Sequence, residues 1–559
     1  MIELSEISRD RLVAWTRAIA RWTRLSGTAE ERAAAEYVAG ELRALGYVTS
    51  VLRHSAYISL PAAAALRVAS SPDADVRCIT HSMGLSTSPG GETAELVYVG
   101  KGERQDWTRA GATGKFGLVE GRATPQRALD ATRAGARGVV FISGRLPHEM
   151  CCSPVWGNPS ELTVGELPAA VLISVGRSDG EAIRERCIRG RVEIHVSAEV
   201  ETGWTETPIV EADLAPGHPD ADGTFVMLSG HLDSWYLGAM DNGAANAAML
   251  EVARLVAERR QHLRRGLRVL FWSGHSHGRY SSSAWYADER FVELDERCVA
   301  HVNADSLGAI DADRLVTNSM PETAGLAVEA ALWAAHTKLE PRRVGRNSDQ
   351  SFLGIGIPTV LGSVSHQDDG SLGWWWHTPE DTIDKIDPAR LVRDTGIFVR
   401  VVERLLTEPV LPLDYVQSAT DVRANLESLA EPLAGRFDLT LAITEAARLE
   451  ELCRRLLDAQ AMARKAAQHA AAINACLREL GRVLIPATYT RAGRHGHDPA
   501  LDVPFLPKLE GARRLVASPP DSDAARLLIV DLVRARSHVT SALRRGCAIV
   551  EACLAQVDA

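Results

Sequence analysis

The spacing of apolar residues changes along the chain, and its first two stretches differ in kind. Over residues 8–46 apolar side chains recur every three or four positions, which predicts amphipathic helices. Thr28 followed by Glu31 is a typical helix start, and Gly46 is a typical stop. From about residue 60 to 205 the pattern shifts to short β-forming runs broken by Gly and Pro, such as AELVYVG and GVVFISG. This change of period predicts an inserted β-rich module.

The rest of the chain alternates strands with helices and then becomes helical. The apolar runs TFVMLSG, LRVLFWSG, CVAHVNAD, RLVTNS and IPTVLGSVS are separated by helical stretches, which is typical of an α/β domain with a mostly parallel sheet covered on both faces. Beyond the proline-bounded EPVLPLDY the sequence favours helices, the longest over 439–472 and 524–554. We therefore expect three units with these bounds: 1–59 together with 206–408 as the α/β domain, 60–205 as the insertion, and 409–559 as a helical domain.

The composition narrows the class of protein. Asp and Glu outnumber Lys and Arg by 72 to 62, a net charge of −10, which disfavours a nucleic-acid binder because phosphates require a clustered basic face. No apolar run approaches the roughly 20 residues of a membrane span, and the first residues lack the pattern of a signal peptide. Nine cysteines without a CxxC pair predict reduced thiols. We therefore expect a cytoplasmic protein that binds neither nucleic acid nor membrane.

Four residues that bind metals well stand near the expected carboxyl ends of strands, where an open α/β sheet places its chemistry. His231 follows TFVMLSG, Asp241 precedes a helix, Asp305 closes CVAHVNAD, and His377 lies in WWWHTPEDT. Two imidazoles and two carboxylates form a suitable ligand set for zinc or a similar cation. Asp233 is a candidate for holding the tautomer of His231 from behind. Each residue alone is a weak signal, because single histidines and helix-capping aspartates are common.

Three segments resemble the motifs of the co-catalytic zinc aminopeptidase and glutamate carboxypeptidase family. They are SGHLDSWYLGAMDNGAANAAMLEVARLV, HVNADSLG and WWWHTPEDTIDKID, in the family's order. GKFGLVEGRATPQRALDATRAGARGVVFISG resembles a protease-associated domain, and the C-terminal helices resemble the dimerisation domain of the transferrin-receptor-like branch. The resemblance implies a metallopeptidase-like core with an inserted protease-associated domain, and a homodimer formed through the helical domain.

The resemblance also implies a metal site, carried over residue by residue. His231, Asp241 and Asp305 would hold one ion, and Asp241 would bridge to a second ion that His377 also binds. The cofactor would be zinc or another divalent transition metal, with one or two ions per chain.

The chain departs from the family at two positions that matter for catalysis. The family has two consecutive glutamates, a general base and a ligand of the second ion, where this chain has His275 and Ser276. Two dications about 3.5–4 Å apart repel by roughly 17–19 kcal/mol at an effective dielectric of about 20, so losing a carboxylate disfavours double occupancy. The site is then mononuclear, or it holds two ions with His275 or His277 as the replacement ligand. A histidine can also serve as the general base.

Three further features bear on substrate and assembly. Trp376 falls where the carboxypeptidase branch has a Tyr that stabilises the oxyanion, and it is a candidate for lining a substrate pocket. Asp349 lies in a segment that resembles a substrate-side loop, where it meets a free amine or simply forms a turn. Residues 482–497 predict a loop at a dimer contact or over the active site.

We expect a metal-dependent hydrolase of an amide or peptide-like bond in a small molecule or short peptide, with His275 or His277 taking a proton from the attacking water. Two alternatives remain at this stage. One is a non-catalytic, receptor-like homodimer that keeps the fold, and the other is a metal-dependent lyase on the same scaffold.

Overall fold

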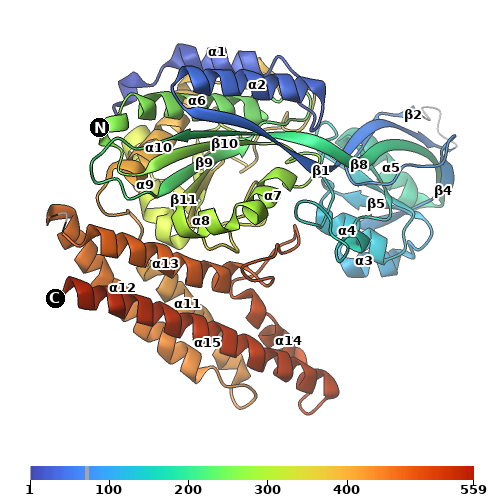
Figure 1. The fold of residues 1–559 in the computed structure, drawn as a ribbon. Helices are drawn as coiled ribbons and strands as arrows, with labels where there is room; N and C mark the ends of the chain where they lie inside the picture. Colours follow the sequence, from blue (N-terminus) through green and yellow to red (C-terminus); the bar gives the residue numbers. More distant parts are fainter. Residues whose placement is uncertain (1, 70–74, 467, 559) are drawn as a thin grey trace.

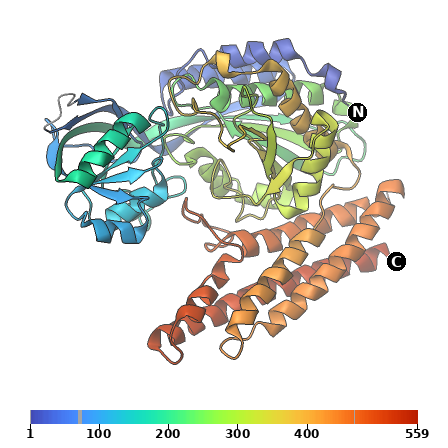
Figure 2. The same cartoon turned by 180° about the vertical axis from the view of Figure 1, so that it is seen from behind.

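The computed structural model describes residues 2–69, 75–466 and 468–558. The chain forms an α/β domain, a second lobe joined to it by two long strands, and a layer of long helices against the α/β domain (Figures 1 and 2). The arrangement agrees with the α/β class and the C-terminal helices that the sequence predicts.

The centre of the α/β domain is a set of parallel strands. Their order is β14-β11-β9-β10, with every neighbouring pair parallel, and β8 then pairs antiparallel with β10. All four parallel strands are buried along their whole length, which explains why their sequences read as continuous apolar runs. Their bounds are β9 Phe225–His231, β10 Gly266–Trp272, β11 Cys298–Ala304 and β14 Thr359–Gly362.

Helices cover both faces of this sheet, as expected. Four of them pack together on one face, and α7 and α8 lie on the other (Figure 1). The first group is α1 Arg9–Ile19, α2 Ala29–Ala44, α6 Ala245–Ala257 and α10 Pro388–Thr407. On the opposite face are α7 Ser281–Glu289 and α8 Phe291–Arg297. A further helix, α9 Pro321–Ala335, packs on α10. The Thr28 hydroxyl caps α2, but the carboxylate of Glu31 accepts from Gly27 N–H and the Ser273 hydroxyl.

The run RLVTNS forms a strand outside the central sheet. It is β12 Arg314–Asn318, which pairs with β13 Glu340–Arg342 and β15 Ser365–His366 in a separate small sheet. The apolar run therefore predicted the strand correctly, but the strand does not belong to the central sheet.

Two long antiparallel strands connect the α/β domain to the second lobe. β1 Val48–Val68 pairs with β8 Val192–Leu214 along nearly its whole length, with one irregularity after Pro61. The expected boundaries at 59/60 and 205/206 lie inside these strands. The sheet of the α/β domain therefore continues into the lobe as one twelve-stranded sheet.

The second lobe is an α/β unit with its own core. Its strands β4, β5, β6 and β7 are parallel, and the apolar clusters around them are separate from the main core. The strands are β2 Asp75–Val76, β3 Cys78–Thr80, β4 Glu92–Gly100, β5 Phe116–Glu120, β6 Gly138–Ile142 and β7 Val171–Val175. The lobe also contains three helices, α3 Arg104–Ala110, α4 Pro125–Arg133 and α5 Arg177–Arg189.

The helical domain corrects two expectations. The single helix expected over 439–472 is two helices, because the chain turns through a left-handed His469 after α12. Residues 482–489, expected in a loop, belong to α13 despite Pro486. The helices are α11 Val416–Ala430, α12 Thr440–Ala466, α13 Ala470–Tyr489, α14 Gly511–Ala517 and α15 Asp523–Val557.

The helical domain and the α/β domain share one hydrophobic core. A single cluster of buried side chains runs from Leu12 of α1 to Leu543 of α15. These two parts therefore pack as one body. Within the described residues no helix is long and apolar enough to cross a membrane.

Arg482 of α13 ties the helical domain to the α/β domain through main-chain carbonyls. Its side chain is 7% exposed and donates to the carbonyls of four residues in the α/β domain. These are Leu294, Asp295, Cys298 and Gly356, at 2.6–3.0 Å.

We expect Arg482→Met to lower the free energy of unfolding by about 3–5 kcal/mol, because it removes the guanidinium donors from four carbonyls at once. The shift is measured from the urea midpoint of the transition that reports on the helical domain. Arg534→Met is the control, since that side chain is 79% exposed. Equal midpoints for the two variants would contradict the role of Arg482.

Candidate metal centre

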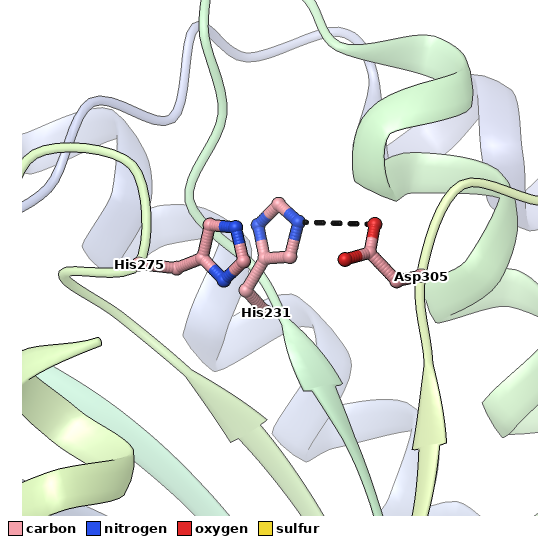
Figure 3. A group of neighbouring side chains, drawn as sticks. All are labelled: His231, His275 and Asp305. Carbon is pink, nitrogen blue, oxygen red and sulfur yellow. Dashed lines mark ion pairs between the residues drawn. The ribbon is translucent and has the colours of Figure 1, made fainter. Parts of the chain in front are cut away.

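Three of the expected site residues meet where parallel strands end. His231 is the last residue of β9, His275 follows β10 by three residues, and Asp305 directly follows β11. One ligand atom from each lies within 4.8 Å of the others (Figure 3). Because β9, β10 and β11 are parallel neighbours, their carboxyl ends bring these residues to one edge of the sheet.

Asp241 lies between the two histidines that the metal motifs provide. Its Oδ1 is 3.0 Å from His231 Nε2, and its Oδ2 is 2.9 Å from His377 Nε2. His231 Nε2 is also 3.7 Å from Asp305 Oδ1. The structure therefore brings His231, Asp241, Asp305 and His377 together, with Asp241 between the two histidines.

Each imidazole is held through its Nδ1 atom. His231 Nδ1 lies 2.8 Å from the carbonyl of Asp233, and His377 Nδ1 lies 2.6 Å from the carbonyl of Glu149. Since a carbonyl only accepts, both Nδ1 atoms carry the proton. His275 Nδ1 lies 2.9 Å from the carboxylate of Asp349. In the neutral form of each ring Nε2 is thereby left with a lone pair, and His231 and His377 donate from Nε2 to Asp241 only when that nitrogen is protonated.

The charge around His231 is suited to a cation. Burial alone would lower the pKa of His231, but the carboxylates of Asp233, Asp241 and Asp305 raise it well above its ordinary value. Burial likewise works to raise the pKa of Asp241, yet hydrogen bonds from His231 and His377 hold it well below its ordinary value. Among the described residues neither Asp241 nor Asp305 forms an ion pair with Lys or Arg. The site therefore stabilises positive charge at the point where these ligands meet.

The spacing of three donor atoms also fits a zinc-sized ion. Ligand atoms 2.0–2.1 Å from a tetrahedral ion lie about 3.3–3.4 Å apart. His231 Nε2 is 3.0 Å from Asp241 and 3.7 Å from Asp305, values on either side of that distance. His231, Asp241 and Asp305 can therefore hold one ion with small adjustments.

His275 has a different relation to this point. Its ring stacks on that of His231 with centroids 3.7 Å apart and planes 10° apart. The lone pair of an imidazole nitrogen lies in the ring plane, so two parallel rings do not direct their lone pairs at one ion. His275 is near the ion position but stands beside it in this conformation.

Asp233 lies behind the site and organises the altered loop. Its carboxylate accepts from the Ser276 N–H at 2.8 Å and from the Ser26 hydroxyl at 2.8 Å. The sequence predicts that this carboxylate holds the tautomer of His231, but the carbonyl of Asp233 is the nearer acceptor, at 2.8 Å against 3.7 Å. The Ser276 hydroxyl is buried without a hydrogen-bond partner.

His277, a candidate base or ligand, lies apart from the donor atoms. Its Nδ1 is 2.9 Å from the Ser26 hydroxyl, and its ring packs on Trp235 at 4.2 Å. It is fully buried and not part of the group of metal-binding atoms. The structure therefore brings His275, rather than His277, to the ion position.

Trp376 and Asp349 occupy supporting positions. The ring of Trp376 stacks on His377 at 3.5 Å and lies 5.0 Å from the guanidinium of Arg122 in the second lobe. Asp349 is fully buried, with one oxygen bound to His275 and the other to the hydroxyl of Ser283. Asp349 therefore lies beneath His275, whereas the sequence predicts contact with a substrate amine or a turn.

Several residues that support the site lack a strong sequence signal. Asp381 accepts the N–H groups of Met240 and Asp241 at 2.9 and 3.0 Å, and its place in the TPEDT motif is the one available signal. Buried Arg24 donates to five carbonyls, among them those of Leu232 and Gly238 in the loop after His231. Glu149 acts through its main chain, which leaves no mark in the sequence.

Part of the chain is similar to known peptidases. Residues 210–402 match Peptidase family M28. Aminopeptidase YwaD of Bacillus subtilis (strain 168) is 26% identical over 380 residues, covering 66% of this chain and 78% of the relative. Probable glutamate carboxypeptidase AMP1 of Arabidopsis thaliana is 25% identical over 374 residues, covering 59% of this chain and 51% of the relative. This chain thus spans about half the length of that second relative.

A solved structure shares the fold. BSAP, a zinc aminopeptidase from Bacillus subtilis, superposes with a TM-score of 0.57 at 22% identity, over 74% of this chain and 97% of its own. At 22% identity this similarity shows the fold alone.

We expect Asp381→Asn to weaken zinc binding by about 10- to 100-fold. The two carboxylate oxygens of Asp381 accept one N–H each, from Met240 and Asp241, whereas an amide has a single oxygen acceptor. Affinity is measured by competition with a chromophoric zinc chelator. Asp384→Asn in the same loop is the control, since that side chain is 65% exposed and bonded only to neighbours. If both variants keep the parent affinity, Asp381 does not support the site.

Proposed function

We propose that this chain, which carries a domain of peptidase family M28, is a metal-dependent hydrolase of an amide or peptide-like bond in a small molecule or short peptide. The observation that carries the proposal is the convergence of His231, Asp241 and Asp305 at the strand ends of that domain. Relatives named as aminopeptidases and glutamate carboxypeptidases support the reaction class.

We further propose that the centre holds one ion. Asp241 and Asp305 supply two negative charges, which balance one dication, and a second ion would leave an excess of two positive charges in a buried site. Where the family has a glutamate ligand for a second ion, this chain has the neutral hydroxyl of Ser276, a residue that is 3% exposed. His377 then lies beside Asp241, with Nε2 2.9 Å from Oδ2, without holding a second ion.

A bound dication would polarise the substrate carbonyl and lower the pKa of water. The protein's own part in the reaction is to move a proton. His275 Nε2 is the acceptor, because Nδ1 is committed to Asp349 and the ring stands beside the ion position. The Asp349 carboxylate stabilises the imidazolium that forms, as in other histidine–carboxylate pairs.

The substrate would enter from a cavity between the second lobe and the tryptophan loop. This cavity is about 1050 Å³ in volume, and Arg122 and Trp374 are among its lining residues. A volume near the upper end of ordinary ligand sites suits a small molecule or a short peptide. Trp376, between Arg122 and His377, would form part of the path to the reacting bond.

As a test, metal content and turnover are measured on protein purified without added metal, using a panel of aminoacyl and dipeptide amides. We expect about one ion per chain, loss of turnover on chelation, and a fall in turnover of about 10²- to 10⁴-fold for His275→Ala with metal content unchanged. His497→Ala is the matched control, because its ring pairs with exposed Asp288 away from the site.

Each contrary result has a distinct meaning. Absence of metal, with stability unchanged on chelation, favours a scaffold and contradicts the hydrolase. Two ions per chain contradict the single-ion site. Full turnover in His275→Ala removes that residue from the reaction.

We also propose a homodimer formed through the helical domain. The outer face of α15 exposes Leu527, Val530 and Val533 by 69%, 50% and 41% at a spacing of three residues. On α12, Leu441 and Met462 are 56% and 62% exposed. A second copy of the chain would bury this apolar surface.

We expect Val530→Glu to convert the dimer to a monomer in sedimentation velocity, because it places a charge in the apolar contact. Leu162→Glu in the second lobe is the control, since that residue is 91% exposed. A Val530→Glu protein that sediments as the parent dimer would place the interface elsewhere.

A further inference from the structure

Behind His275 the second lobe contributes one large side chain. Trp156 is 4% exposed, and its ring packs on Tyr280 at 4.3 Å, which in turn contacts the ring of His275 at 4.8 Å. The guanidinium of Arg346 lies 3.8 Å from the centre of the Trp156 ring. An unbroken series of packed rings thus connects the second lobe to the histidine beside the ion position.

A chain of hydrogen bonds runs parallel to these rings. Trp156 Nε1 lies 2.9 Å from the Ser351 hydroxyl, which lies 2.8 Å from the Ser283 hydroxyl. The Ser283 hydroxyl lies 2.9 Å from Asp349 Oδ1, and Asp349 Oδ2 lies 2.9 Å from His275 Nδ1. Four hydrogen bonds of ordinary length therefore link an indole in one lobe to the imidazole in the other.

The two ends of this chain fix the direction of every proton in it. An indole N–H only donates and a carboxylate only accepts. The Trp156 N–H therefore donates to Ser351, whose single hydroxyl proton is left for Ser283, and Ser283 donates to Asp349. The carbonyl of Tyr280, at 3.3 Å, is the more distant alternative acceptor for Ser283.

Asp349 depends on these donors because, within the part of the chain that the structure describes, no Lys or Arg forms an ion pair with it. It is fully buried, and among the described residues its one ion-pair partner is His275. Its two oxygens are used by Ser283 and His275. A buried carboxylate that loses a donor pays a desolvation cost and shifts to regain a partner. The position of His275 therefore depends on the complete chain.

We propose that Trp156 is a positioning residue for His275, acting through Ser351, Ser283 and Asp349, so that the second lobe sets the orientation of the proton acceptor. This inference rests on the proposed function for its catalytic consequence. The same segment of the lobe also supplies the Glu149 carbonyl that holds His377 Nδ1 at 2.6 Å. Residues 149–156 thus orient two of the three imidazoles at the site.

The test is Trp156→Phe, which removes the indole N–H and keeps an aromatic ring against Tyr280. We expect kcat to fall about 3- to 10-fold with KM within about twofold, less than the 10- to 100-fold typical of a direct partner, because three residues lie between. Trp107→Phe is the matched control, since Trp107 is equally buried in the same lobe and its Nε1 donates to the Gly102 carbonyl at 3.2 Å.

A second measurement does not depend on turnover. The proton on His275 Nδ1 is followed by proton NMR and assigned by its loss in His275→Ala. We expect its resonance to shift in Trp156→Phe and to keep its position in Trp107→Phe, because a change at one end of a hydrogen-bond chain alters the polarisation of the others.

A third variant separates positioning from general loss of packing. Ser351→Ala breaks the chain one step nearer to His275, and the double variant Trp156→Phe/Ser351→Ala should lose no more kcat than Ser351→Ala alone. Additive losses would contradict a single chain. An unshifted resonance together with a parental kcat in Trp156→Phe would overturn the inference and leave the proposed hydrolase intact. Absence of metal and of turnover in the parent protein would instead overturn the proposed function.

Discussion

The site depends on fixing the Nδ1 atom of each imidazole, because only then is the opposite nitrogen left with a free lone pair on the side of the site. His231, His275 and His377 obtain their acceptors from the Asp233 carbonyl, the Asp349 carboxylate and the Glu149 carbonyl. These acceptors belong to a loop of the α/β domain, to the segment before β14, and to the second lobe. The second lobe must therefore be correctly placed for the site to form, because it supplies one of the three acceptors.

The fold meets this requirement by making the connection between the lobes stiff. β1 and β8 pair from Val48 to Val68 of β1 and carry the sheet from one lobe into the other. Glu149 adds a two-point contact, since its N–H donates to the His377 carbonyl at 2.9 Å while its carbonyl accepts from the His377 ring. Its carboxyl also accepts from the Tyr236 hydroxyl at 3.0 Å. Each contact is modest, but together they hold the lobe to the loop that carries His377.

The sequence predicts those parts of the site that follow from strand ends and local motifs, and it misses those that depend on tertiary contacts. His231 and Asp305 could be found because they directly follow buried apolar strands, and His377 because its motif is local. Glu149 contributes a carbonyl, which every residue has, so no residue type marks it. The continuity of the sheet through β1 and β8 depends on strand pairing between residues more than a hundred positions apart. The helix expected over 439–472 failed because a left-handed turn at His469 needs no Gly or Pro to signal it.

The exchange of glutamate for histidine at position 275 has an electrostatic counterpart in Asp349. A glutamate base changes from −1 to neutral when it takes a proton, whereas a lone histidine becomes a cation beside a dication, which the Coulomb repulsion between them opposes. The His275–Asp349 pair restores the first situation, because the pair as a whole changes from −1 to neutral. The negative charge lies on Asp349, on the side of the imidazole away from the ion position. Ser283 donates to Asp349, and Trp156 contacts Ser283 through the Ser351 hydroxyl. In the hydrolase that we propose, this arrangement keeps the charge change of the reaction and would leave a single dication with two anionic ligands, Asp241 and Asp305, which balance its charge.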